Sequence, residues 1–471
     1  MRASASRSDE EPPELPAGWA DSHLQILTSL SALLPREGAY TCTMCKSWLL
    51  ISGLLPFTVQ QGAAQSSLNY ATLYSFTGQN DDGATPAGSL AIGANGHIYG
   101  TTEFGGAGAC KVSNQTGCGT VFELSPSGSP GSAFTETVLY SFTAQNGDGA
   151  YPSGGLTMDG QGALYGATSE GGDRNHGAVF VLKPPAAPSA QWTETILHSF
   201  AGGERDGSSP AGGLVFGKNG VLYGVTQHGG KQHLGTVFAL HPPTNGAEVW
   251  AEKVLFSFTG QGDAGVSPSA GVVVSADGTL YGTALGYAGV AFALNAGSGG
   301  SWTESVLYAF GSQPGDGGTP YGGVVMGNNG KLYGTNNAGG PPSSICVPPV
   351  AGCGTVFELA PGAEGGNWTE KVIYAFTSPY SDGANPVAGV VIGPGGILYG
   401  TTTDGPGTVF QLAPPTAPGN VWTETVLHTF TGRNGDGSDP VANLVIGPNG
   451  AIYGTTVGGG TAGMGTVFAL K

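Results

Sequence analysis

Charged residues are scarce in this chain, and bases are scarcer than acids. Charged side chains make up 10% of the 471 residues, with 32 Asp and Glu against 15 Lys and Arg. The net charge of −17 repels the phosphates of nucleic acids and of anionic membranes, and no basic cluster offsets it. We therefore expect no nucleic acid among the partners of this protein. Such a charge favours solubility whatever the protein binds, so it indicates no particular ligand.

A hydrophobic run that could span a membrane is also lacking. The apolar stretch 48–59 is too short for a transmembrane helix, which needs about 20 residues. It lies within residues 44–64, which have the pattern of a secretory signal peptide, with Lys46 as the positive start and residues 62–64 as the small cleavage-site residues. We therefore predict export to the periplasm or the medium, with no transmembrane segment in the mature protein.

This signal-like segment lies unusually far inside the chain. Residues 1–43 show neither a repeat nor a targeting pattern. We therefore interpret Met44 as the true initiator, residues 1–43 as an unstructured leader or a start-site error, and residues 65–471 as the folded body.

Cysteine is rare too, and its placement agrees with export. Of six cysteines, Cys42 and Cys45 would leave with the leader, and the other four form two local pairs in equivalent loops of two repeats. The pairs are Cys110 with Cys118 and Cys346 with Cys353. We predict that both pairs are disulfides in an oxidising compartment. Zinc is the alternative, but neither pair has the close CxxC spacing of a zinc knuckle.

Glycine and proline, in contrast, are abundant, with 86 and 32 residues. They indicate short strands and many turns, and hydrophobic residues spread evenly after residue 66 argue against disorder. One unit recurs seven times, because the Phe of an LYSF-like segment is always followed 23 residues later by the Tyr of an LYG-like segment. The pairs are Phe76–Tyr99, Phe142–Tyr165, Phe200–Tyr223, Phe258–Tyr281, Phe310–Tyr333, Phe376–Tyr399 and Phe430–Tyr453.

Each unit contains four candidate strands, which in repeat 3 are residues 193–200, 213–217, 221–226 and 235–240. Aromatic and β-branched residues fill them, and Gly, Pro and Asn separate them. The Asn-Gly step between the second and third strands predicts a two-residue hairpin. Seven units of about 55 residues predict an all-β fold, a seven-bladed β-propeller of four-stranded antiparallel blades. A β-solenoid is the alternative, but its coils do not usually double back through tight hairpins.

The connections predict the strand order within a blade. The link from the Phe to the following GLV-like strand always spans 14 residues, which suits a fixed crossing between blades. The GLV-like strand is then innermost and the LYSF-like strand outermost. The first outermost strand, 68–76, lacks a blade of its own and is predicted to pair with 465–470 and close the ring. It carries Tyr70 where the six later copies carry a Glu, six residues before the Phe.

The motifs LYSFTGxNxDGxxP, GxLYGTT and GTVFxL recur in this order over residues 68–471. They resemble the GloVer-type tandem repeat of bacterial exported "choice-of-anchor" proteins. The resemblance implies a secreted or surface-displayed protein, and it brings no established reaction or ligand. Because the sequence ends at GTVFALK without the C-terminal anchor of some relatives, we expect release rather than attachment.

The links between blades carry Asp-Gly-x-x-Pro, with the Asp six residues after the Phe in six copies: Asp82, Asp148, Asp206, Asp316, Asp382 and Asp436. Repeat 4 departs, with Asp263 one residue early and Ala264 at the usual place. In the structural interpretation the Asp accepts backbone N–H bonds, the Gly adopts positive φ and the Pro fixes the approach to the next strand. In the functional alternative these oxygen-rich turns bind calcium, although they lack the other ligands of an EF-hand loop. We expect no required cofactor and keep calcium as the alternative.

The loops between the LYG and VF segments differ among the copies, and this strand order places them on the same face as the DG links. Repeats 2 and 3 carry EGGDRNHG (170–177) and QHGGKQHLG (227–235). The candidate ligand-binding residues of all the loops are Arg174, His176, His228, Lys231, His233, Glu103, Glu170 and Asp404. Neutral histidines could bind a metal, and the cations could hold an anionic sugar or a carboxylate. A solvated loop is the simpler explanation.

No catalytic residue is assigned from the sequence. A glycosidase or lyase needs paired carboxylates, or a base beside a cation, near one cleft, and the separation of the unrepeated acids Glu103, Glu170 and Asp404 cannot be read from their positions. We expect a secreted, monomeric binding or scaffold protein, with a carbohydrate or a surface polymer as its partner. An extracellular carbohydrate-active hydrolase or lyase that uses the variable-loop face is the alternative.

The repeated aromatics suggest sugar platforms at first sight. Besides the Tyr of LYG they include Trp192, Trp250, Trp302, Trp368 and Trp422. Their strict recurrence predicts that they pack between blades instead.

Overall fold

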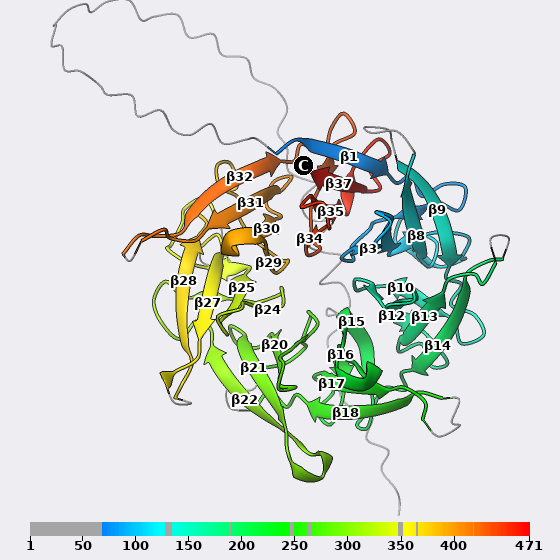
Figure 1. The fold of residues 1–471 in the computed structure, drawn as a ribbon, viewed down its shortest axis with the longest axis horizontal. Helices are drawn as coiled ribbons and strands as arrows, with labels where there is room; N and C mark the ends of the chain where they lie inside the picture. Colours follow the sequence, from blue (N-terminus) through cyan, green and yellow to red (C-terminus); the bar gives the residue numbers. More distant parts are fainter. Residues whose placement is uncertain are drawn as a thin grey trace, which may run out of the picture. The chain divides into compact units, whose positions relative to one another are not determined.

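Seven antiparallel sheets, each with four strands from its inner to its outer edge, form a ring in the computed structural model (Figure 1), which confirms the predicted seven-bladed propeller. The structure describes residues 68–127, 134–187, 190–244, 249–261, 265–346, 352–363, 366–417 and 419–471. In these ranges there is no α-helix, and no helix is long and apolar enough to cross a membrane. The predicted leader 1–43 and signal peptide 44–64 lie outside the described residues, as do Asp263 and Ala264 of repeat 4.

The strands of each blade run from the innermost to the outermost in sequence order, except in the closing blade. Blade 1 consists of β3 (Ala91–Ile92), β4 (Ile98–Thr102), β8 (Thr120–Pro126) and β9 (Phe134–Ser141). Blade 2 consists of β11 (Thr157–Met158), β12 (Leu164–Gly171), β13 (Ala178–Lys183) and β14 (Thr193–Ser199). Blade 3 consists of β15 (Gly207–Phe216), β16 (Leu222–Gly229), β17 (Thr236–His241) and β18 (Ala251–Ser257). Blades 4 and 5 are β19 (Val273–Val274), β20 (Leu280–Ala284), β21 (Val290–Ala296) and β22 (Trp302–Ala309); β24 (Val325–Met326), β25 (Leu332–Asn336), β27 (Thr355–Ala360) and β28 (Thr369–Ala375). Blades 6 and 7 are β29 (Val391–Ile392), β30 (Leu398–Thr402), β31 (Thr408–Ala413) and β32 (Thr423–Thr429); β34 (Val445–Ile446), β35 (Ile452–Thr456), β37 (Thr466–Leu470) and β1 (Tyr70–Ser75).

Short elements complete the sheets at the links and in the loops. They are β2 (Gly83–Ala84) paired with β5 (Phe104–Gly105), β10 (Gly149–Pro152) paired with β12, β23 (Gly317–Gly318) paired with β26 (Ala338–Gly339), β33 (Gly437–Ser438) paired with β36 (Gly458–Gly459), and the hairpin of β6 (Lys111–Val112) and β7 (Gln115–Thr116). The 3-10 turns are η1 (Lys218–Gly220), η2 (Ser298–Gly300) and η4 (Pro394–Gly396).

The ring closes through the N-terminal strand. β1 is the outermost strand of blade 7 and pairs antiparallel with β37, with Tyr70 opposite Leu470 and Ser75 opposite Thr466. Figure 1 shows the blue β1 beside the red β37. The predicted closure and the predicted strand order are both confirmed.

The LYG and GTVF motifs recur together because one makes room for the other. Gly100 of β4 lies opposite Phe122 of β8, and a Cβ on Gly100 would lie 2.5 Å from Cζ of that ring. Phe122 is fully buried and packs edge-on against Phe76 of the preceding outermost strand, with ring centroids 5.0 Å apart. The same glycine and phenylalanine pair occurs in all seven blades. The Gly of LYG, the Phe of GTVF and the Phe of LYSF therefore form one packing contact, which joins each blade to the next.

We expect Gly166→Ala to destabilise the protein by about 2 kcal/mol, because its Cβ would lie 2.6 Å from Cζ of Phe180 in a closely packed blade. Gly160→Ala in the same blade is the matched control, since a Cβ there meets no atom within 4 Å. Thermal or denaturant unfolding of the two variants measures the difference. Equal stability of the two variants would show that the blade has room for the methyl group.

The repeated Trp and Tyr residues also join neighbouring blades. Tyr99 of blade 1 packs against Trp192 of blade 2 with ring centroids 6.1 Å apart, and four further Tyr–Trp pairs repeat this contact at 5.9 to 6.3 Å. This confirms that these aromatics pack between blades.

The Asn-Gly corner differs from the prediction. The Gly93 amide donates to the His97 carbonyl (2.9 Å), which leaves three residues in the loop, and Gly96 has φ 80°. The two-residue hairpin was therefore wrong: the corner is a three-residue loop with a left-handed glycine. The side chain of Asn95 accepts the His97 amide (3.2 Å), so this Asn stabilises its own loop.

In the DG links, the hydrogen bonds of the Asp agree with the structural interpretation, but the position of the positive φ does not. The Asp side chains accept the expected backbone bonds, as when Thr77 donates its amide and its hydroxyl to Asp82, both at 2.7 Å. The following Gly has positive φ only at Gly383, so that part of the prediction was wrong for the other five links. At Gly83 the need for glycine is steric, because a Cβ would lie 2.4 Å from the Thr102 side chain.

The positive φ occurs instead in the residue just before the Pro. All seven of these residues have φ between 45° and 59°: Thr85, Tyr151, Ser209, Ser267, Thr319, Asn385 and Asp439. This conformation lets each amide donate to a loop carbonyl of the preceding blade, as from Tyr151 to Cys118 (2.9 Å). Tertiary hydrogen bonding between blades therefore decides the conformation of the link.

Candidate functional site

The DG links and the LYG-to-VF loops lie on one face of the propeller, which we call the loop face. Gly83 of a link pairs with Gly105 of a loop, and the equivalent glycines pair in blades 2, 3, 5 and 7. Two of these loops carry the predicted disulfides, Cys110–Cys118 and Cys346–Cys353, and both are present. The expected placement of links and variable loops on one face is confirmed.

Glu103 and Glu170 come together on the loop face of blades 1 and 2. Glu103 follows β4, and Glu170 lies in β12 opposite Ala150 of the link. Burial raises the pKa of Glu103 to about 7, and the nearby Glu170 carboxylate adds to this rise. Burial also raises the pKa of Tyr151, helped by the same two carboxylates. The sequence could not place these three residues together, because they belong to two repeats.

Neither glutamate has a hydrogen-bond or ion-pair partner for its side chain within the described ranges. Tyr151 of the link lies near both carboxylates, and its ring packs against Phe104 with centroids 5.4 Å apart. The two carboxyl groups are therefore held near a rigid aromatic pair and remain available to a ligand.

Two of the predicted histidines, His176 and His228, come together on the neighbouring blades 2 and 3. His176 Nδ1 lies 3.1 Å from the Ser208 hydroxyl, and Ser208 lies opposite His228 in the β15–β16 ladder. Side chains of directly opposite strand residues lie on the same side of the sheet. Burial lowers the pKa of His228, which favours a neutral imidazole. His176, Ser208 and His228 therefore form a second polar group on the loop face.

The remaining predicted site residues make no polar side-chain contact with these groups among the described residues. Arg174, Lys231 and His233 are exposed, and their side chains have no polar partner in the part of the chain that the structure describes. Asp404 belongs to blade 6, which blade 7 separates from blade 1, and its side chain accepts the Gly405 amide (2.9 Å). In the described ranges, none of the predicted histidines belongs to a group of three close metal ligands.

The outer rim holds a second kind of site, whose role the sequence did not indicate. We call it the rim niche: a link Asp, the Glu of the next outermost strand, and the residue two before the Phe of the preceding outermost strand. The Glu and Asp pairs are Glu136 with Asp82, Glu194 with Asp148, Glu252 with Asp206, Glu370 with Asp316 and Glu424 with Asp382. Burial first, and the neighbouring Asp second, raise the pKa of each of these Glu residues to about 7.

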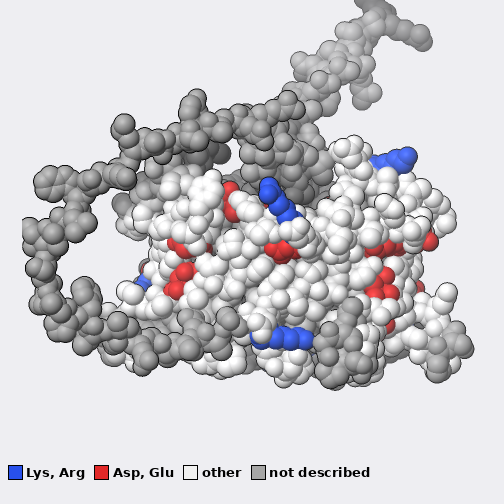
Figure 2. All heavy atoms as spheres, turned by 90° about the horizontal axis from the view of Figure 1, so that it is seen from above, with Lys and Arg blue, Asp and Glu red and all other residues white. Residues whose placement is uncertain are grey.

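The Glu of each niche has one unsatisfied carboxylate oxygen, and Oδ1 of Asp82 and of Asp148 is unsatisfied as well. Oε1 is buried and lacks a hydrogen-bond partner in the described structure at Glu136, Glu194, Glu252, Glu304, Glu370 and Glu424. The niche of Tyr140, Asp148 and Glu194 opens into a cavity of about 410 Å³. In Figure 2, the acidic atoms on the visible side form separate small patches rather than one continuous field. The only sequence signal was the recurrence of the Glu six residues before the Phe.

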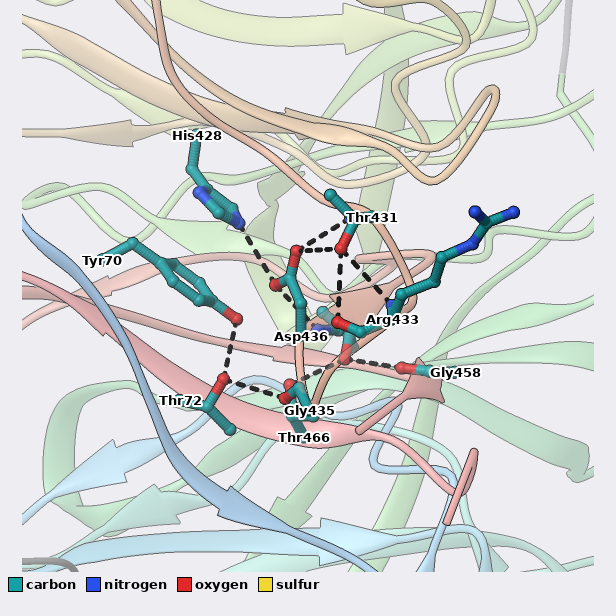
Figure 3. Close-up of polar contacts among 11 residues, drawn as sticks. Tyr70, Thr72, His428, Thr431, Arg433, Gly435, Asp436, Gly458 and Thr466 are labelled. Carbon is teal, nitrogen blue, oxygen red and sulfur yellow. Dashed lines mark hydrogen bonds and ion pairs between the residues drawn. The ribbon is translucent and has the colours of Figure 1, made fainter. Parts of the chain in front are cut away.

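The closing junction has a tyrosine in place of the glutamate. Tyr70 stacks on His428 with ring centroids 3.7 Å apart, and its hydroxyl lies 3.1 Å from that of Thr72 (Figure 3). His428 Nε2 lies 3.2 Å from Asp436 Oδ1. Burial would raise the pKa of Asp436, but contacts with Tyr70, Thr431 and His428 outweigh it and lower that pKa.

Comparison with known proteins finds a sequence family and distant structural likenesses. The family described as "Gloeobacter/Verrucomicrobia repeat" matches residues 61–203 and 186–405. No curated protein matches the chain in sequence. A proposed 6-phosphogluconolactonase from Bacteroides fragilis NCTC 9343 is similar in structure, with TM-score 0.48 and 15% identity over 81% of this chain and 98% of that one. The periplasmic gluconolactonase of Pseudomonas aeruginosa has TM-score 0.45 and 15% identity over 72% and 84%. These likenesses are too distant to assign an activity to this chain.

Proposed function

This chain belongs to the Gloeobacter/Verrucomicrobia repeat family, and we propose that it is an exported propeller that binds a carbohydrate or another hydroxyl-rich surface polymer. The observation that carries the proposal is the set of polar side chains without partners on the loop face of blades 1 to 3. Glu103 and Glu170 offer acceptors, and the exposed Arg174 and Lys231 offer donors. A half-buried carboxyl group without a partner is unfavourable, and ligand hydroxyl groups would relieve it.

Export is the second part of the proposal. The two disulfides support an oxidising compartment, and the signal-like residues 44–64 give a route to it.

Hydrolysis is a second candidate, because one specific observation favours it. Glu103 has a pKa near neutrality beside a second carboxyl group from another blade. Such a pair suits general acid catalysis, in which Glu103 donates its proton to the leaving oxygen while Glu170 accepts a proton from the attacking water.

We expect the double variant Glu103→Gln, Glu170→Gln to weaken binding to a polysaccharide found on a glycan array by about tenfold or more, since two hydrogen bonds to carboxylates are lost. Asp404→Asn is the matched control, because Asp404 occupies the position of Glu170 in blade 6. Affinity and release of reducing ends are measured on the same ligands. Binding that survives in the double variant contradicts the site, and product release that Glu103→Gln abolishes makes the protein a hydrolase.

A further inference from the structure

One rim niche differs from the others in containing a histidine. His198 of β14, Asp206 of the link to blade 3 and Glu252 of β18 bring one ligand atom each within 4.8 Å of one another. His198 Nε2 lies 3.4 Å from Asp206 Oδ1. Two ligands bound to one metal at about 2.1 Å, at tetrahedral or octahedral angles, lie roughly 3 to 3.5 Å apart. The spacing of His198 and Asp206 therefore suits a shared ion, and Glu252 lies within reach of it.

Glu252, the third residue of this group, also has an unsatisfied oxygen. Oε1 of Glu252 is buried and has no hydrogen-bond donor among the described residues. Burial and the Asp206 carboxylate both oppose its charge, so a cation here would relieve two unfavourable interactions.

Hydrogen bonds and ring packing also hold the side chains of Asp206 and His198 in position. Asp206 accepts the Ala201 amide on Oδ2 and the Gly207 amide on Oδ1, both at 2.7 Å. The ring of His198 packs edge-on against Phe200, with centroids 4.7 Å apart. The side chains of His198 and Asp206 remain 20% and 14% exposed, which leaves an ion access from solvent. Such outer contacts orient the ligands of metal sites.

The complete ligand set occurs once among the described junctions. Tyrosine replaces the histidine at four junctions, at Tyr74, Tyr140, Tyr308 and Tyr374. Blade 4 has Phe256 at this position, and the closing junction has His428 but carries Tyr70 in place of the glutamate. Most niches thus offer oxygen alone, whereas this one adds the imidazole nitrogen that borderline transition metals favour.

We propose that His198, Asp206 and Glu252 bind one divalent ion of the zinc type, with the imidazole nitrogen and two carboxylate oxygens as ligands and solvent completing the coordination. The ion takes the place of the proton between His198 and Asp206. It joins the outermost strand of blade 2 to that of blade 3 and thereby stabilises the rim at this junction.

The test is a calorimetric titration of the chelator-treated full chain with Zn²⁺ alone. We expect one strong site, and a loss of affinity of at least about tenfold in His198→Tyr and in Glu252→Gln. His198→Tyr should fold, because Tyr occupies this position at four other junctions. Glu304→Gln changes the equivalent Glu of the blade 4 outermost strand, where Phe256 stands in place of the histidine, and should keep the site. Thermal melting of each metal-free variant verifies folding.

The reverse substitution tests the geometry directly. Tyr140→His supplies the missing imidazole beside Asp148 and Glu194, and we expect the number of strong Zn²⁺ sites to rise from one to two. The proposal is overturned if His198→Tyr leaves a strong Zn²⁺ site intact, or if the site disappears in the double variant His176→Gln and His228→Gln of the loop face. Binding of Ca²⁺ in preference to Zn²⁺ would overturn it as well.

Discussion

Removing residues 68–76 should destroy cooperative unfolding of the propeller. This segment supplies the outermost strand of blade 7, and its loss would expose the whole edge of β37. It also removes Phe76, which is fully buried, and the stack of Tyr70 on His428. Loss of one buried Phe side chain already costs about 3–5 kcal/mol. The free-energy cost of the full deletion should therefore exceed the free energy of unfolding of most domains.

The same segment moved to the other end of the chain is the matched control. Asn69 and Lys471 already exchange backbone hydrogen bonds of 2.7 and 3.1 Å. A short Gly–Ser turn after Lys471, followed by residues 68–76, should therefore restore the melting transition. Circular dichroism and calorimetry compare the two variants with the parent. A deletion variant that melts like the parent would contradict closure by β1.

Stability should fall as the pH rises from about 5 to about 8. Glu136, Glu194, Glu370 and Glu424 have pKa values raised from 4.5 to about 7, so the folded protein holds protons that the unfolded chain has released. Stability decreases with pH wherever the folded state binds more protons. The contribution is complete below about pH 4.5 and is lost as the pH rises through about 7.

The negative charge of a neighbouring Asp also raises the pKa of each of these glutamates. Each faces one link Asp and one Tyr: Asp82 and Tyr74, Asp148 and Tyr140, Asp316 and Tyr308, Asp382 and Tyr374. Because these carboxyl groups are only half-buried, solvent screening reduces each contribution to about 1 kcal/mol. Loss of all four contributions as the pH rises should lower the melting temperature by about 5 °C for a chain of this size.

Melting curves with a chelator present, at about pH 5 and about pH 8, measure this change. The variant with Gln at all four positions should have a much flatter dependence on pH, since Gln does not titrate. A parent protein whose melting temperature rises over this range, or a variant with an unchanged slope, would show that the niche carboxyl groups are not protonated in the folded state.

The local turns show where prediction from sequence stops. The Asn-Gly pair predicted a corner, but the closing bond from Gly93 to His97 made it a three-residue loop. The link Gly was expected to carry positive φ, but Tyr151 and its equivalents carry it, because their amides donate to the preceding blade. Backbone conformation at these sites depends on partners that no local pattern specifies.

The candidate sites show the same limit. Sequence variation indicated the loops of blades 2 and 3 and the loop acids of blades 1, 2 and 6, and the structure brings two of these acids, Glu103 and Glu170, together. The recurring Glu on the outermost strands was visible, but its buried, unsatisfied oxygen was not. For the proposed metal site, the further signal was His198 at the position of a repeated Tyr in a repeat whose link Asp and following Glu are both present.

The sequence by itself determined the number of blades, the order of their strands, the closing strand and the disulfide pairs, because each follows from a spacing that repeats along the chain. Only the tertiary structure decided which residues of different repeats meet. Contacts such as those among His198, Asp206 and Glu252 depend on side-chain direction and burial between adjacent blades, and a one-dimensional repeat specifies neither.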